Sequence, residues 1–241
     1  MAENEQKEVV RAEASAISRV LGRILELFGW RLLLGLVLSA GALLLLLWLT
    51  GEVFEGDTAV FDERLRSYVH GFSNPPLTVA MRSLSFLGST VFLVTLGVFT
   101  VVVFAYLRLR RALVIFVITM AGEIFLDLTM KAGFMRSRPQ PFYPYPPLES
   151  YSYPSGHALA SFCFYGITAW LIATRTGSRR AKLVIWSIAV SLIFLIGLSR
   201  IYLGVHYPSD VIAGYLTALI WTFVVAFGDH IIRGKTVNQG G

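Results

Sequence analysis

The chain has 241 residues, of which 55% are hydrophobic and only 15% are charged, and its mean hydropathy is +0.65. An average soluble domain has about 45–50% apolar and about 25% charged residues. This composition supplies too little polar surface for a soluble enzyme, a disordered chain or a nucleic-acid module, and it excludes all three. The single cysteine, Cys163, excludes an intrachain disulfide and a cysteine-based metal site, and its apolar neighbours indicate a packing role.

Long apolar runs predict membrane-spanning helices. A bilayer core about 30 Å thick is crossed by about 20 mostly apolar residues in a helix. Six segments meet or approach this length: 32–51, 83–107, 112–130, 158–174, 183–199 and 211–228. Only the third contains charged residues, Glu123 and Asp127. Because backbone polar groups cannot stay unpaired in lipid, all six segments are expected to be helices.

The predicted fold class is therefore all-α, a polytopic membrane protein with six transmembrane helices. A short amphipathic helix is expected in the first outer loop, 52–82, and the prolines at 75 and 76 should end it. Its apolar face would consist of Phe61, Leu65, Tyr68 and Val69. We expect one six-span domain over 32–228, an amphipathic cytoplasmic segment at 1–31 and a cytoplasmic tail at 229–241.

The basic residues predict the orientation of the spans. Fourteen of the 21 Lys and Arg residues lie in the N-terminal segment, the 108–111 and 174–182 loops and the tail, and seven lie on the other side. The positive-inside rule places the fourteen, and both termini, in the cytoplasm. The net charge of +6 is thus mostly accounted for by topology, and no nucleic-acid partner is expected.

Residues able to do chemistry gather at the outer ends of spans three to six. They form three groups: Lys131 with Arg138-Pro139; Pro154-Ser155-Gly156-His157; and Ser199-Arg200 with His206 and Asp210. Ser155 is a favourable N-cap residue, so the backbone N–H groups of Gly156 and His157 should form an anion site at a helix N-terminus. Full positive charges come from three further residues: Lys131, Arg138 and Arg200. So many donors indicate a phosphate group as substrate.

The spacing of His206 and Asp210 favours nucleophilic catalysis. At four residues apart, the Asp210 carboxylate can reach one imidazole nitrogen, fix the tautomer and leave the other nitrogen as nucleophile. His157 is then available to protonate the leaving oxygen. The chain shows no cluster of Asp, Glu or His suited to a divalent metal, so no cofactor is expected and the cations would take its electrostatic role.

Asp127 is expected to support the phosphate site through Lys131. Glu123, Asp127 and Lys131 recur at i, i+4 and i+8 on one helical face. Acids within a span are costly and usually have a reason, which favours Asp127 as the partner that positions Lys131. A polar contact between helices, unrelated to catalysis, is the alternative.

The motifs Lys-x6-Arg-Pro, Pro-Ser-Gly-His and Ser-Arg-x5-His-x3-Asp resemble the three-part signature of the type 2 phosphatidic acid phosphatase superfamily. That superfamily includes membrane lipid phosphatases and, with a related site on a soluble fold, vanadium haloperoxidases. All signature positions match, and the resemblance covers roughly residues 84–227. It implies that His206 becomes a phosphohistidine oriented by Asp210 and that His157 is the acid. It also implies that the phosphate is held by Lys131, Arg138, Ser155, Gly156 and Arg200.

These observations favour a lipid phosphatase on the outer, periplasmic face of the cytoplasmic membrane. Its substrate would be a lipid phosphate or diphosphate, such as phosphatidate, phosphatidylglycerophosphate or undecaprenyl diphosphate, with no obligatory protein partner. One alternative is a phosphotransferase, for example one acting on lipid A, that passes the phosphate from His206 to another lipid. A transporter with a phosphate-binding mouth would need polar residues in the middle of several spans, and the membrane composition disfavours a haloperoxidase.

Overall fold

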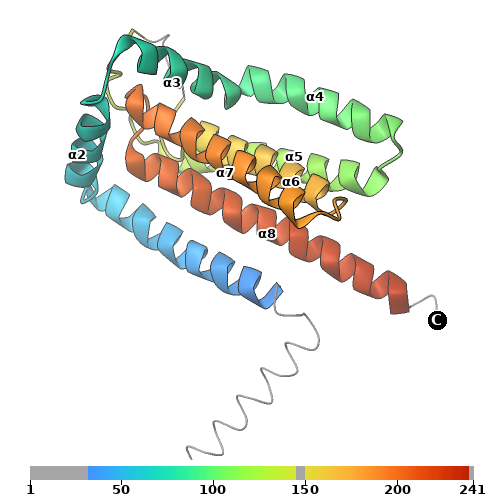
Figure 1. The fold of residues 1–241 in the computed structure, drawn as a ribbon. Helices are drawn as coiled ribbons and strands as arrows, with labels where there is room; N and C mark the ends of the chain where they lie inside the picture. The colour runs from blue at the N-terminus through green and yellow to red at the C-terminus, as the bar shows by residue number, and fades with distance from the viewer. Residues whose placement is uncertain (1–31, 145–149, 239–241) are drawn as a thin grey trace, which may run out of the picture. The chain divides into compact units, whose positions relative to one another are not determined.

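The computed structural model describes residues 32–144 and 150–238, and within these ranges all regular secondary structure is helical. An apolar helix, Leu32–Glu55, comes first. The helices labelled in Figure 1 follow in chain order: α2 (Ala59–His70), α3 (Pro75–Leu87), α4 (Thr90–Tyr106), α5 (Arg110–Phe134), α6 (Gly156–Ala173), α7 (Arg179–Tyr202) and α8 (Pro208–Asn238).

The chain divides into two units, Met1–Gly41 and Ala42–Gly241. Only residues 32–41 of the first unit are described, and they are helical; the amphipathic segment expected at 1–31 lies outside the described residues. The contacts reported below belong to the second unit. In that unit α8 continues without a break to Asn238, so residues 229–238 of the expected tail are helical. The domain boundary at 228 stays a prediction.

The predicted all-helical membrane fold is confirmed. Five helices are each long and apolar enough to cross a membrane: Leu32–Glu55, Arg110–Phe134, Gly156–Ala173, Arg179–Tyr202 and Pro208–Arg233. The pair α3–α4 makes a sixth span if it is counted as one, although its two helices are bent by 47°. The protein is therefore a multi-pass membrane protein.

The prediction of one continuous helix over 83–107 was wrong. The chain breaks at Gly88, and Ser89 begins α4 by accepting a hydrogen bond from the Phe92 N–H at 3.3 Å. A Cβ atom on Gly88 would lie 2.4 Å from the Ile196 side chain, so only glycine permits this close approach to α7. The prolines at 75 and 76 begin α3, because proline fits the first turn of a helix, whose N–H groups have no partner.

The amphipathic helix expected in the first outer loop is present as α2, and its buried face consists of charged residues that the sequence analysis had not singled out. Phe61 and Tyr68 are exposed, whereas Asp62 and Arg66 are buried. A buried charged residue requires partners, and Asp62 finds them on α8 and on the segment after α5, as described below. Helical periodicity correctly predicted the helix, but it did not indicate that Asp62 and Arg66 are its buried residues.

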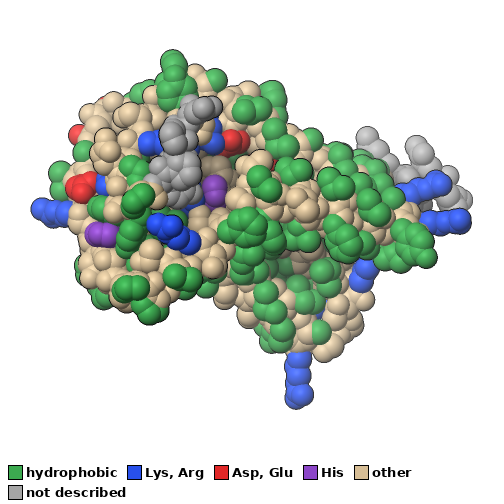
Figure 2. Space-filling model, turned by 90° about the horizontal axis from the view of Figure 1, so that it is seen from above, with side chains coloured by type: hydrophobic (Ala, Val, Ile, Leu, Met, Phe, Trp, Pro, Cys, Tyr) green, Lys and Arg blue, Asp and Glu red, His purple; other side chains and the backbone are tan. Residues whose placement is uncertain are grey.

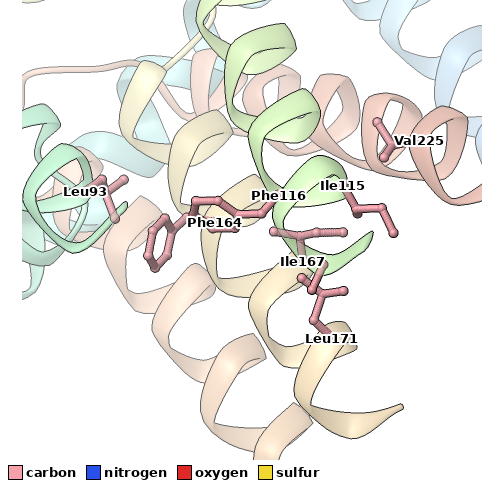
Figure 3. Close-up of a cluster of buried hydrophobic side chains, with 8 residues drawn as sticks. Leu93, Ile115, Phe116, Phe164, Ile167, Leu171 and Val225 are labelled. Atoms are coloured by element: carbon pink, nitrogen blue, oxygen red, sulfur yellow. The ribbon is translucent and has the colours of Figure 1, made fainter. Parts of the chain in front are cut away.

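Helix α6 lies at the centre of the second unit and contacts α4, α5, α7 and α8 (Figure 1). A cluster of buried apolar side chains joins four of these helices, α4, α5, α6 and α8 (Figure 3). Its members are Leu93, Ala112, Ile115, Phe116, Phe164, Ile167, Leu171 and Val225. Cys163 is also buried in α6, consistent with a packing role. This core packs the middle and C-terminal half of α6 against its neighbours, and the start of α6 lies at the other end of the helix.

Candidate active site

Four helix ends meet where the sequence motifs lie. These are the C-terminal ends of α5 and α7 and the N-terminal ends of α6 and α8, together with residues 135–144, 150–155 and 203–207. Figure 2 shows histidine side chains with lysine and arginine side chains at one end of the view, and hydrophobic side chains over the helices beyond; further Lys and Arg side chains lie at the opposite end. A cavity of about 680 Å³ opens here. Seven of the nine residues predicted for the site line it: Asp127, Lys131, Arg138, Gly156, His157, Arg200 and His206.

The other two predicted residues, Ser155 and Asp210, are buried behind the cavity wall. The Ser155 N–H donates to the backbone oxygen of Asp210 at 2.9 Å, which ties the start of α6 to the start of α8. Ser155 occupies the N-cap position of α6, as the sequence predicts, although its hydroxyl makes no capping bond. That hydroxyl is buried and has no hydrogen-bond partner within residues 32–144 and 150–238.

His206 lies between the carboxylate of Asp210 and the guanidinium of Arg138. Its Nδ1 is 3.4 Å from Oδ2 of Asp210, and its Nε2 is 2.9 Å from Nη1 of Arg138. Because a guanidinium can only donate, Nε2 must accept, and the neutral ring therefore carries its proton on Nδ1, facing Asp210. Burial lowers the pKa of His206 to about 4, although Asp210 acts in the opposite direction. The ring is thus neutral near pH 7, with the Nε2 lone pair directed at the cavity side.

A tight turn between α7 and α8 sets this arrangement. Gly204 has φ +74°, a left-handed conformation that glycine adopts without strain, and a Cβ there would lie 2.7 Å from the Phe142 ring. Asp210 falls in the first turn of α8, where its Oδ2 accepts from the Tyr207 N–H at 2.8 Å and from the Ser152 hydroxyl. These bonds hold the carboxylate against the imidazole.

The N-terminus of α6 approaches the Lys131 side chain closely. A Cβ atom on Gly156 would lie 2.9 Å from Nζ of Lys131 and 2.9 Å from Oδ1 of Asp127, so any larger residue here would displace the ends of these two side chains. Lys131 donates to Oδ2 of Asp127 at 2.7 Å. The contact agrees with the expected pairing of Asp127 with Lys131, and its role in catalysis stays a prediction.

The two arginines of the motifs are fixed by other segments. Arg138 donates to the backbone oxygens of Ser150 at 2.7 Å and Val205 at 3.0 Å. Arg200, in the last turn of α7, is buried and donates to the hydroxyl of Ser85 on α3. Both guanidinium groups are therefore held in place before any ligand arrives.

Sequence reasoning missed Arg136 and Asp62. Arg136 donates to Oδ1 of Asp210 at 2.6 Å and to Oδ2 of Asp62 at 2.8 Å. Asp62 in turn accepts from the Ser209 N–H at 2.9 Å and from its hydroxyl at 2.6 Å. Burial opposes the charge on Arg136, but Asp210 and Asp62 outweigh it and raise the pKa of this arginine. Arg136 lies between Lys131 and Arg138 of the first motif, two residues before Arg138. This position was the one feature of the sequence that could have indicated a role for Arg136 at the site.

Within the described ranges, no group of three or more His, Cys, Asp or Glu side chains could hold a metal ion. The charged groups at the cavity are mainly cations that suit an anion, with Asp127 paired to one of them. A neutral histidine whose Nε2 lone pair faces the cavity and accepts from Arg138, with a buried carboxylate behind it and several fixed cations in front, can take up a phosphoryl group.

Fold and site together define a multi-pass membrane phosphatase. The family model of the PAP2 superfamily matches residues 112–230, which include every motif residue described above. The chain belongs to this superfamily.

Two curated proteins are similar in sequence to this chain. Phosphatidylglycerophosphatase B from Bacillus subtilis is 29% identical over 174 residues, which cover 71% of this chain and 85% of the relative. Undecaprenyl-diphosphatase from Sulfolobus acidocaldarius is 32% identical over 122 residues, covering 48% and 55% of the two chains.

Two solved structures of membrane proteins are similar in fold to this chain. The crystal structure of the first transmembrane PAP2-type phosphatidylglycerolphosphate phosphatase from Bacillus subtilis has a TM-score of 0.74 at 26% identity, covering 80% of this chain and 96% of that one. The structure of LpxE from Aquifex aeolicus has a TM-score of 0.53 at 25% identity, covering 69% and 94%.

Proposed function

We propose that this protein hydrolyses the terminal phosphate of a lipid phosphate or diphosphate through a phosphohistidine on His206. The observation that carries the proposal is the position of His206. Its Nε2 contacts a guanidinium at the head of a cavity, and its Nδ1 faces a buried carboxylate. The curated relatives are named for their action on phosphatidylglycerophosphate and undecaprenyl diphosphate, and these names support the same class of substrate for this protein.

The first chemical step transfers the phosphoryl group to the enzyme. The terminal phosphate displaces the guanidinium of Arg138 from Nε2 of His206 while remaining bound to it. Nε2 attacks phosphorus, and the bond from phosphorus to the leaving oxygen breaks. Asp210 stabilises the positive charge that develops on the ring. The dianionic phosphate favours the protonated form of His157, which gives its proton to the leaving oxygen.

Groups around the phosphate would hold its oxygens without a metal ion. The backbone N–H groups at the start of α6 add neutral donors. The Ser155 hydroxyl, which is buried and has no partner in the described ranges, would join them once the bound phosphate draws it toward the cavity. Full positive charges come from Lys131, Arg138 and Arg200, which all line the cavity. In the second step water attacks phosphorus, with His157 as base, and the N–P bond breaks to release phosphate and restore His206.

The walls of the cavity below the phosphate site support a lipid as substrate. Away from the charged residues the cavity is lined by apolar side chains of α4 and α5, among them Val94, Val98, Val101 and Val117. Valine side chains exposed on membrane-spanning helices face the hydrocarbon of a bilayer. A lipid can therefore place its chains in this part of the cavity while its phosphate reaches His206.

We propose that the site faces the outside of the cytoplasmic membrane and that both termini are cytoplasmic. The site lies at the opposite ends of α5–α8 from the basic 108–111 and 174–182 loops, which the positive-inside rule places inside. In a Cys163→Ser background, Asp57→Cys should react with an impermeant maleimide added to intact cells, and Arg179→Cys should react only after the cells are opened. The reverse pattern would place the site in the cytoplasm.

The activity is tested by phosphate release from purified protein in detergent. The panel contains phosphatidate, phosphatidylglycerophosphate and a polyprenyl diphosphate. His206→Ala should abolish release and any acid-labile phosphoenzyme, whereas His230→Ala, near the far end of α8, serves as a matched control with full activity. An acceptor alcohol that captures the phosphate in place of water would point to a phosphotransferase. Full activity of His206→Ala would refute the mechanism.

A further inference from the structure

Glu123 is a buried acid that the mechanism above does not use. It lies on α5, two helical turns from Lys131 toward the middle of the span, and only 5% of it is exposed. It lines the same cavity as His206. No group in residues 32–144 or 150–238 makes a hydrogen bond or an ion pair with it. Since a buried polar group without a partner is costly, a ligand is the natural source of one.

The surroundings of Glu123 mark where the cavity changes from polar to apolar. The eight residues from Glu123 to Lys131 correspond to about 12 Å of helix rise. Above Glu123 the α5 side of the cavity wall carries Asp127 and Lys131 beside the apolar Ile124 and Leu128. Beyond Glu123 the wall of α5 continues with Met120, Val117 and other apolar side chains. Glu123 therefore carries the last acidic group before the hydrocarbon part of the cavity.

We propose that Glu123 selects glycerolipids by donating a hydrogen bond to an ester carbonyl of the diacylglycerol moiety. The ester groups are the last polar groups of such a lipid before its hydrocarbon chains, so they match the level of Glu123. An ionised carboxylate is not sustained among apolar side chains without a cation in contact, and the neutral acid carries one O–H donor. This proposal rests on the proposed lipid phosphatase function.

The same group disfavours polyprenyl diphosphates. Below its phosphates a polyprenyl lipid has only hydrocarbon, so it would leave the Glu123 carboxyl without a partner. A site built around a hydrogen bond rejects a substrate that cannot form it. Glu123 thus distinguishes the two kinds of substrate on which the curated relatives act.

The test compares three substrates: diacyl phosphatidylglycerophosphate, its dialkyl ether analogue with the same chain lengths, and a polyprenyl diphosphate. For the wild-type protein we expect kcat/KM to be about tenfold higher on the ester than on the ether, the size of one hydrogen bond. Glu123→Leu should bring this ratio to about one and raise activity on the polyprenyl lipid. Glu123→Gln, which keeps an N–H donor, should retain most of the preference.

Met120→Leu is the matched control, because Met120 lines the same cavity one turn away and offers no donor. It should leave the ester-to-ether ratio unchanged. An equal rate of the wild-type protein on ester and ether, or an unchanged ratio in Glu123→Leu, would overturn the role of Glu123 and leave the phosphatase proposal intact. The wild-type comparison decides the matter even if Glu123→Leu does not fold. Absence of phosphate release from every lipid, with a normal melting transition, would overturn both proposals.

Discussion

Asp62 and Asp210 lie on different helices, α2 and α8, and a single guanidinium, that of Arg136, binds both carboxylates. Both acids are fully buried, and the Cζ atom of Arg136 also lies 4.3 Å from the centre of the Tyr207 ring. Asp210 contacts His206 through its other oxygen. The outer-loop helix α2 is thereby connected, through one arginine, to the group that orients the proposed nucleophile.

The Asp62–Arg136–Asp210 chain should matter for stability. Arg136→Ala leaves two buried carboxylates without their cation, and we expect it to lower the free energy of unfolding by about 3–5 kcal/mol. Thermal melting of the detergent-purified variant measures this loss. Arg64→Ala, an exposed arginine on α2, is the control and should melt like the wild-type protein. An unchanged melting temperature in Arg136→Ala would show that the buried acids do not depend on this cation.

Asp62 should also affect catalysis, because it positions Arg136, which in turn holds Asp210. Asp62→Asn keeps the shape but weakens the hold on Arg136, so we expect kcat to fall by roughly 10-fold or more while KM changes little. Steady-state kinetics on the lipid substrate measure both values. A rise in KM at constant kcat would instead place Asp62 in substrate binding.

Asp210→Asn should separate orientation of His206 from substrate binding. The amide keeps the size of the side chain but favours the wrong imidazole tautomer. We therefore expect kcat to fall by roughly 10²–10⁴, as it does when the aspartate of a Ser-His-Asp triad is replaced by asparagine. KM should change much less, because Asp210 does not line the cavity. If kcat stays near wild type and only the melting temperature falls, the carboxylate is structural and the orienting role must be dropped.

His157→Ala should lose activity in a way that depends on the leaving group. Lipid alkoxide needs a proton as it departs, whereas nitrophenolate does not, so the variant should be nearly inactive on lipid phosphates and partly active on nitrophenyl phosphate. The ratio of the two rates in variant and wild type is the measurement. Equal losses on both substrates would count against His157 as the general acid.

His206 should take up its second ring proton at a lower pH than an ordinary histidine does. Burial lowers its pKa to about 4, so the native ring stays neutral between pH 6.5 and about 4 while the unfolded chain takes up a proton there. The folded state therefore loses stability as the pH falls through this range. Nitrogen-15 NMR of labelled histidines, with His206→Asn for assignment, reads the protonation directly. A transition near pH 6.5 at His206 would contradict the buried, neutral ring.

Metal removal should leave the reaction unchanged. Three cations and a helix N-terminus face the phosphate position, so activity is expected to survive EDTA. Vanadate should inhibit, because it takes the five-coordinate geometry of phosphoryl transfer. Loss of activity in EDTA that Mg²⁺ restores would refute the metal-free mechanism.

The sequence by itself determined the membrane class, most of the spans and the residues that gather at the site. Uninterrupted apolar runs leave a helix as the only structure that pairs its backbone in lipid, and motifs at the ends of such runs must come to one side of the bilayer. Lys131, His157 and His206 could therefore be placed on one side of the bilayer from the sequence, and the packing of the helices brings them to one cavity.

The tertiary structure alone decided the break at Gly88, the inward face of α2 and the role of Arg136. Each depends on a contact between segments far apart in the chain: the Ile196 side chain against Gly88, and Asp62 and Asp210 on either side of Arg136. Local hydropathy reports how a residue partitions on its own, so it gave no sign that Asp62 is buried. A charged side chain is buried when its partner is fixed nearby, and only the packing of the helices supplies that partner.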